Sequence, residues 1–193
     1  MNSRSMLDIA NWAHHSWLPQ ARPARNERAR AAAAAHLLER FPLLAEAGVS
    51  QMPWFAARLS RPAGVRLMCL CAALACARTL RLVVSASARA RFFRTTGLPN
   101  LSALQCHPRG DGLDLELDEP VDFFDRRSLC VAGLALALRS VSGEGQYRWV
   151  QLRLPRDCVE AAAHWRLPAV SPQAALELIG DAASLLAARR TSC

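Results

Sequence analysis

The chain contains 193 residues, of which 52% are hydrophobic and 21% are charged. This balance excludes an intrinsically disordered chain, and the length is sufficient for one domain with a substantial core. All 24 basic residues are arginines, which excludes chemistry that needs a lysine, such as Schiff-base formation or phosphate binding by a Walker motif.

We therefore predict a single, mainly helical domain over residues 1–193, with an N-terminal segment and connector at 1–25 and a helical core at 26–193. The first helix is expected over 26–40, because this segment is rich in alanine and is followed by Pro42.

The next helix is predicted to start near Ser60 and to include residues 63–84. Its sequence is apolar on almost all sides, which is typical of a central buried helix. Residues 85–95 continue as a basic helix, which Gly97 and Pro99 end.

Two later segments alternate between apolar and polar residues. Leucines alternate with acidic residues in 112–118, and apolar residues alternate with polar ones in 147–154. A period of two indicates a half-buried strand, so we predict a small two-stranded β element from these segments. The alternative, that both segments are irregular or helical, stays open.

Two further helices are expected in the second half of the chain. The apolar segment 121–141 predicts a second buried helix. Ser171 and Pro172 match the residues preferred at a helix start, which predicts a last helix over 173–190.

Charge is distributed unevenly along the chain. Residues 1–110 contain 15 arginines and 4 acidic residues, whereas residues 111–125 contain 7 acidic residues and no basic one. The net charge of +8 could favour nucleic acid or an acidic membrane surface. Because the arginines are scattered singly, solvated helix faces and acidic protein partners are the preferred interpretation.

The seven cysteines are mostly within apolar segments and are interpreted as small buried side chains in a reducing compartment. The apolar segments 67–77 and 129–138 are too short to cross a bilayer, which needs roughly 20 residues. No signal peptide is recognisable. These features predict a cytoplasmic protein.

The adjacent residues His14 and His15 are the first candidate site. Neighbours on a helix point about 100° apart, so we do not expect them to bind one metal ion together. Trp12 and Trp17 beside them indicate a packed or partner-facing segment. No catalytic motif is recognisable, so we expect no catalytic, metal-binding or cofactor-binding residues.

Several segments resemble one family. The segment His14–Pro19 (HHSWLP) is similar to the His-Pro-Ser-x-Leu-Pro element near the start of the SctK/YscK/OrgA proteins, although His15 replaces the proline. The apolar, arginine-punctuated segment 66–93, the LRLP sequence at Leu152–Pro155 and the C-terminal segment 176–190 also resemble this family, whose members are accessory cytoplasmic subunits of bacterial type III secretion systems.

The resemblance implies a mainly helical, non-enzymatic adaptor of the sorting platform. Such a protein links the cytoplasmic domain of the inner-membrane ring protein (SctD type) to the pod protein (SctQ type), which carries the stator and ATPase. It implies a cytoplasmic protein held at the inner membrane through protein partners, without nucleic acid, cofactor or direct membrane insertion. The alternative is a basic nucleic-acid-binding protein, whose affinity would fall steeply with salt.

Two partner-binding surfaces follow as hypotheses. The first is the N-terminal element, which either anchors a partner or packs the first helix; its candidate residues are His14, Ser16, Trp17 and Leu18. The second is an acidic face that would meet a basic surface; its candidate residues are Asp114, Glu116, Asp118 and Glu119.

Overall fold

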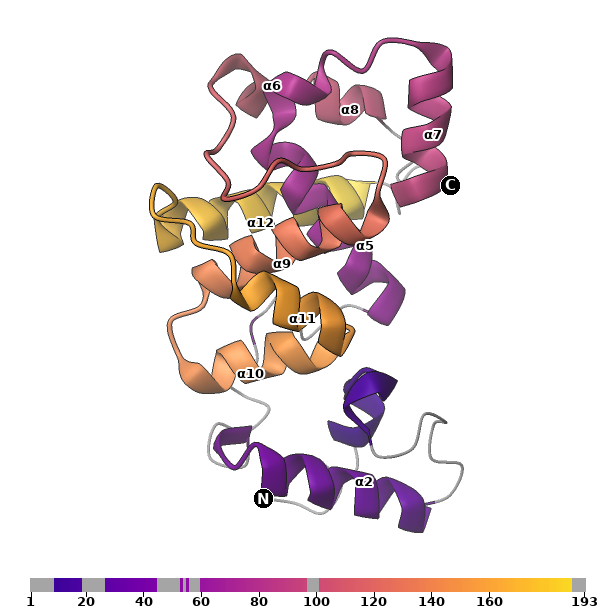
Figure 1. Ribbon diagram of the computed structural model, residues 1–193, viewed down its shortest axis with the longest axis vertical. Coiled ribbons are helices and arrows are strands. Elements are labelled where there is room, and N and C mark those ends of the chain that lie inside the picture. Colours follow the sequence, from indigo (N-terminus) through magenta and orange to yellow (C-terminus); the bar gives the residue numbers. More distant parts are fainter. Residues whose placement is uncertain are drawn as a thin grey trace. The chain divides into compact units, whose positions relative to one another are not determined.

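The computed structural model describes residues 9–18, 27–44, 53, 55, 60–96 and 101–188. The described residues form a mainly helical fold (Figure 1), which confirms the predicted fold class. The chain divides into two compact units: unit 1 is formed by Met1–Gly64 and Val141–Glu160, and unit 2 by Val65–Ser140 and Ala161–Cys193. The single domain over 1–193 stays a prediction.

Unit 1 contains the short 3-10 helix η1 (His15–Trp17) and the helices α2 (Glu27–Arg40) and α10 (Glu144–Arg153). It also includes the first turn of α5 (Arg61–Ala75) and the first part of α11 (Arg156–Ala163). The alanine-rich α2 confirms the helix predicted over 26–40 and buries Ala33, Ala34 and Leu37.

The predicted strand at 147–154 is wrong, because α10 occupies residues 144–153. The alternation does not mark a buried and an exposed face, because four consecutive residues of α10 are buried, the polar Gln151 among them: Trp149, Val150, Gln151 and Leu152. Residues 112–118 form neither a helix nor a strand. The small β element is therefore not formed, and the structure contains no strand within the residues it describes.

Unit 2 contains most of α5 and six further helical segments after it. These are α6 (Ala77–Leu80), α7 (Ala86–Thr96), α8 (Leu101–Gln105), η3 (Pro108–Asp111), α9 (Arg126–Ser140) and α12 (Pro172–Ala188). In Figure 1, α12 runs beside α9, and α6 packs against α8 and η3.

The core of unit 2 is formed around α9, in which every residue from Leu129 to Leu138 is buried. This confirms the second buried helix, although it begins at Arg126 and not at residue 121. The carboxylate of Asp125 accepts hydrogen bonds from the backbone N–H groups of Arg127 (3.0 Å) and Ser128 (2.9 Å), which fixes the start of the helix.

The other helix predictions differ from the structure mainly at their ends. The helix expected through 63–84 is interrupted at Cys76, where α5 gives way to α6. Ser171 caps α12 as predicted, because its Oγ accepts from the backbone N–H of Ala174 at 3.1 Å. Across the ranges described above, no helix is long and apolar enough to cross a membrane.

Candidate functional site

The N-terminal element contacts the end of α10 and the start of α11 within unit 1. The backbone N–H of His14 donates to the carbonyl oxygen of Leu152 at 2.7 Å. Ser16 Oγ accepts from the backbone N–H of Arg156 at 2.9 Å. These bonds join segments that are about 140 residues apart in sequence, and they hold the element as a structural part of the unit.

Trp17 is buried, with 7% of its surface exposed. Its indole N–H donates to the carbonyl oxygen of Leu154 at 2.9 Å, and its ring meets Phe41 edge to face with centroids 5.8 Å apart. The guanidinium groups of Arg40 and Arg156 each lie 5.8 Å from the Trp17 ring centroid. This environment favours the packing role for Trp17 over direct contact with a partner.

Trp12 of the same N-terminal element contacts Arg153, and the sequence analysis did not anticipate this pair. The guanidinium carbon of Arg153 lies 3.9 Å from the Trp12 ring centroid, which is a close cation–π arrangement. Arg153 Nη1 also donates to the carbonyl oxygen of Trp12 at 2.8 Å. No local sequence signal indicates this pair, because Trp12 and Arg153 are 141 residues apart.

The histidines make local contacts. The Nδ1 of His14 accepts from the backbone N–H of Ser16 at 3.2 Å and lies 2.9 Å from Ser16 Oγ. The rings of His14 and His15 are 4.0 Å apart and tilted. Within the part of the chain that the structure describes, no group of three or more His, Cys, Asp or Glu side chains is placed to hold a metal ion. Leu18, the last candidate of this element, packs against Ala10, Ala33 and Ala34.

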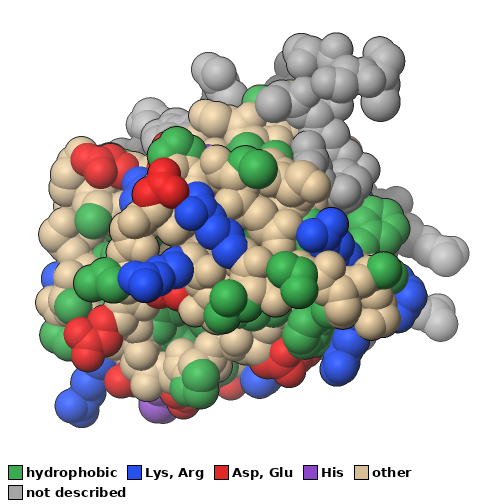
Figure 2. Space-filling view, turned by 90° about the horizontal axis from the view of Figure 1, so that it is seen from above, with side chains coloured by type: hydrophobic (Ala, Val, Ile, Leu, Met, Phe, Trp, Pro, Cys, Tyr) green, Lys and Arg blue, Asp and Glu red, His purple; other side chains and the backbone are tan. Residues whose placement is uncertain are grey.

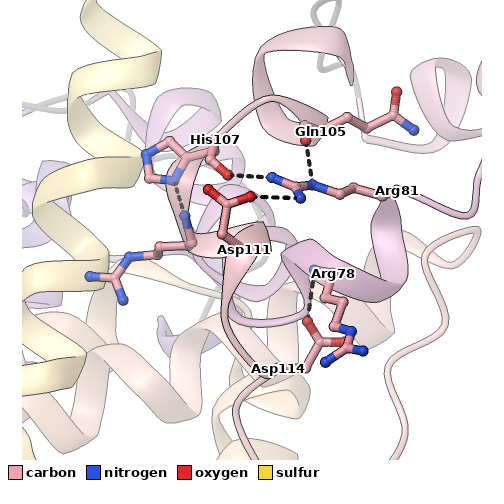
Figure 3. Close-up of polar contacts among 7 residues, drawn as sticks. Arg78, Arg81, Gln105, His107, Asp111 and Asp114 are labelled. Carbon is pink, nitrogen blue, oxygen red and sulfur yellow. Dashed lines mark hydrogen bonds and ion pairs between the residues drawn. The ribbon is translucent and has the colours of Figure 1, made fainter.

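The acidic segment, defined here as residues 111–119, is attached to α5 and α6 through its two central residues, Asp114 and Leu115. The backbone N–H of Leu115 donates to the carbonyl oxygen of Ala75, the last residue of α5, at 2.8 Å. The carboxylate of Asp114 accepts from the backbone N–H groups of Arg78 (2.8 Å) and Thr79 (3.0 Å). Figure 3 shows Asp114 below α6 with its carboxylate directed at Arg78.

Asp114 therefore acts as a helix cap supplied from a distant part of the chain. The two N–H groups that it binds lie in the first turn of α6, where backbone donors have no partner within the helix. The N-cap residue Cys76 supplies no side-chain hydrogen bond. The acidic alternation in the sequence signalled charge, but it gave no indication of this contact.

Of the three remaining candidate acids, one accepts a backbone hydrogen bond and the other two form no ion pair with a described residue. Asp118 accepts a hydrogen bond from the backbone N–H of Arg166 at 3.3 Å. Glu116 and Glu119 are exposed, and neither forms an ion pair with any of the described residues. The segment consequently presents two exposed carboxylates from a backbone that its neighbours hold in place.

The structure also contains a polar junction around Arg81 that the sequence analysis missed (Figure 3). Arg81 Nε donates to the carbonyl oxygen of Gln105 (2.7 Å), Nη2 to that of His107 (3.1 Å), and Nη1 to the Asp111 carboxylate (2.9 Å). The side-chain amide of Gln105 in turn donates to the carbonyl oxygens of Leu80, the last residue of α6, and of Val83 just after it, each at 3.0 Å. This junction fixes the start of the acidic segment.

The cysteines are mostly buried and occur as free thiols among the described residues. Burial raises the pKa of the Cys71 thiol far above its ordinary value. Burial, with a contribution from the negative charge of Asp114, raises the pKa of Cys76 to about 12. Both thiols are therefore protonated and weakly nucleophilic at neutral pH. Cys106, in contrast, is exposed.

Taken together, the candidate residues form structural contacts and one exposed acidic surface. Such a surface can attract and orient a basic partner. Comparison of the chain with protein-family models, with curated proteins and with solved structures finds no match in any of the three.

Proposed function

We propose that this protein is a non-enzymatic adaptor of a bacterial type III secretion system. In this role it would work in the cytoplasm, next to the inner membrane, and contribute to protein secretion and virulence. It would link the cytoplasmic domain of the SctD-type ring protein to the SctQ-type pod protein, and through the pod protein to the stator and ATPase.

The resemblance of the sequence motifs to the SctK/YscK/OrgA proteins supplies the family context for this proposal. The mainly helical fold agrees with that context. An adaptor needs surfaces that are fixed before the partner arrives, because a preorganised surface loses less conformational entropy on binding.

The acidic segment is the observation that carries the proposal. Asp114 and the backbone of Leu115 attach it to α6 and α5, and this leaves Glu116 and Glu119 exposed. Exposed carboxylates in a fixed position would steer a basic protein surface into register and raise the association rate more than the affinity. We therefore assign the docking role chiefly to Glu116 and Glu119, with Asp114 and Asp118 as positioning residues.

The N-terminal element would contribute mainly by holding unit 1 together. Trp17 is buried, so a partner could reach it only if the unit opened. The partner-binding hypothesis for His14, Ser16, Trp17 and Leu18 accordingly becomes a secondary one, in which the element maintains the shape that the partner recognises.

Co-purification tests the proposal. The full chain would be co-expressed with the cytoplasmic domain of the SctD-type protein and, separately, with the SctQ-type protein of the same secretion locus. We expect a stable complex with at least one of them. If neither forms a complex and the chain instead retains nucleic acid in a salt-sensitive way, the adaptor proposal is replaced by the nucleic-acid alternative.

A charge-reversal variant connects the complex to the acidic segment. Replacing Glu116→Lys and Glu119→Lys should slow association with the partner by at least about tenfold at low salt. The matched control is Glu39→Lys with Glu177→Lys, which makes the same charge change at two exposed acids elsewhere. Equal loss of binding in both variants would show that net charge, and not the acidic segment, governs the complex.

A further inference from the structure

We propose that the turn at residues 82–84 and the outward face of α7 form a surface that contacts an anionic lipid bilayer. The contact would be peripheral, at the level of the lipid headgroups, and it would not span the membrane. This goes beyond the adaptor function, because it adds a lipid contact to the protein attachments and can be tested with the chain alone.

Exposed apolar side chains are concentrated in this part of unit 2. Leu82 is 77% exposed, Val84 is 67% exposed and Phe93 is 49% exposed. Three of the five large apolar side chains that are exposed among the described residues therefore lie within twelve positions of each other. Exposed apolar groups that cluster in this way usually mark an interaction surface.

The two faces of α7 explain why Phe93 faces solvent. The inward face is formed by Ala88, Phe92 and Thr96, which are spaced four residues apart; Phe92 and Thr96 are fully buried. The outward face carries Arg89, Ala90, Phe93 and Arg94, all of them exposed. One face of α7 is thus buried, and the other face exposes the ring of Phe93 between arginines.

The charge of the surface identifies the partner as anionic. Residues 77–110 contain six arginines and no acidic residue. Arg89 and Arg94 form no ion pair with any carboxylate in the described ranges. Arginine binds phosphate groups through paired N–H donors, and each arginine near an anionic bilayer contributes about 1 kcal/mol of attraction.

The acidic residues on either side of Phe124, which contacts α7, accept backbone hydrogen bonds. Arg91 lies over the ring of Phe124 at 4.9 Å, which brings the loop before α9 close to α7. The carboxylates that flank this ring bind backbone N–H groups: Asp122 binds that of Phe124 at 2.7 Å, and Asp125 binds those at the start of α9. They leave Arg89 and Arg94 available to an external anion.

A bilayer fits the apolar part better than an acidic protein does. Leu82 and Val84 stand out from a turn, and a protein partner would need a matching pocket for each of them. The boundary between headgroups and acyl chains accepts protruding apolar side chains without such a pocket, and basic side chains beside them bind the headgroups. Figure 2 looks onto the end of unit 2 that carries α6, α7 and α8, and shows hydrophobic and basic side chains with acidic ones among them.

Vesicle sedimentation tests this proposal. The full chain would be mixed with vesicles of phosphatidylcholine containing phosphatidylglycerol, and with vesicles of phosphatidylcholine alone. We expect binding to the anionic vesicles only. Replacing Leu82, Val84 and Phe93 by serine should abolish that binding, while circular dichroism and thermal unfolding stay unchanged because the three side chains are exposed.

A second pair of variants separates this surface from net charge. Arg89→Gln with Arg94→Gln should lower vesicle binding by about fivefold for each arginine. The control, Arg28→Gln with Arg166→Gln, removes the same charge from two exposed positions outside α7 and the loop before α9 and should have little effect. An equal loss in the control would overturn the proposal, since attraction would then depend on overall charge.

The remaining outcomes are also decisive. Failure of the unaltered chain to bind anionic vesicles would overturn the lipid contact but would leave the adaptor proposal intact, because co-purification tests that independently. If the serine variant loses a protein partner while no vesicle binds, the surface belongs to an acidic protein and the bilayer assignment is wrong.

Discussion

Gly133 lies directly against the backbone of Met68, so α9 crosses α5 at a point where position 133 has no room for a side chain. A Cβ atom at position 133 would come within 1.8 Å of the Met68 carbonyl oxygen. Backbone atoms cannot move aside as a flexible side chain can, and both helices are buried here. Glycine is therefore required at position 133 for α9 and α5 to pack in the core of unit 2.

We expect Gly133→Ala to lower the free energy of unfolding by at least about 2 kcal/mol, because the added methyl group forces the two helices apart. Urea unfolding followed by circular dichroism measures the change. Gly180→Ala in α12 is the matched control: nothing lies within 4 Å of a Cβ at that position. Because alanine favours helix, this control should raise the free energy of unfolding by about 0.5–1 kcal/mol. Destabilisation by Gly180→Ala, or tolerance of Gly133→Ala, would contradict the described crossing.

Asp114→Ala should destabilise the protein by about 1–2 kcal/mol, because it removes the side-chain acceptor from two backbone N–H groups in the first turn of α6. Chemical unfolding measures the effect. Glu116→Ala, two residues later and exposed, should change stability by less than about 0.5 kcal/mol. Equal effects of the two substitutions would mean that Asp114 is not a cap but part of the exposed charge.

Trp17→Ala should lower the free energy of unfolding by about 3–5 kcal/mol through loss of buried contacts with Phe41 and its surroundings. Trp17→Phe keeps most of the ring volume and removes the hydrogen bond to Leu154, so its cost should be smaller, about 1–2 kcal/mol.

The same pair of variants separates packing from partner contact. If Trp17 only packs unit 1, the folded Trp17→Phe protein should bind its partner as the unaltered chain does in co-purification. A partner affinity that falls sharply while Trp17→Phe remains folded would restore the direct-contact hypothesis for this residue.

Thiol labelling should distinguish Cys106 from the buried cysteines. At pH 8, iodoacetamide should modify the exposed Cys106 before the other five cysteines that the structure describes, and Cys76 should react slowly because its pKa is raised to about 12. Mass spectrometry after digestion identifies the modified residues, and labelling in denaturant provides the control in which all thiols react. Rapid modification of Cys76 in the folded protein would contradict its raised pKa.

The raised pKa of Cys76 also has a consequence for stability with a definite sign. Between pH 9.0, the ordinary thiol value, and about 12, the unfolded chain releases this proton while the folded chain keeps it. The contribution of Cys76 to stability is therefore fully present below pH 9.0 and is lost as pH rises through the folded value. Cys76→Ala should reduce the loss of stability over this window.

The sequence alone was sufficient to predict the helices whose signals are local. The alanine-rich composition of α2, the cap at Ser171 and the apolar segment that became α9 each lie within one turn or one helix. Helix propensity, capping and burial of an all-apolar segment act over that same distance. The class of fold and the positions of these helices could be predicted for that reason.

The tertiary structure decided everything that depends on contacts between distant segments. The alternating sequence at 147–154 resembled a strand, but residues 149–152 of α10 are all buried. The indole groups of Trp12 and Trp17, each 137 residues away, bind the carbonyl oxygens of Trp149 in α10 and of Leu154 just after it. In the sequence, Asp114 is one member of an alternating charge pattern. In the structure it caps α6, where its partner Arg78 lies 36 residues earlier. A local pattern reports which residues prefer water, whereas the partner of each buried ring or carboxylate is set by how the chain folds back on itself.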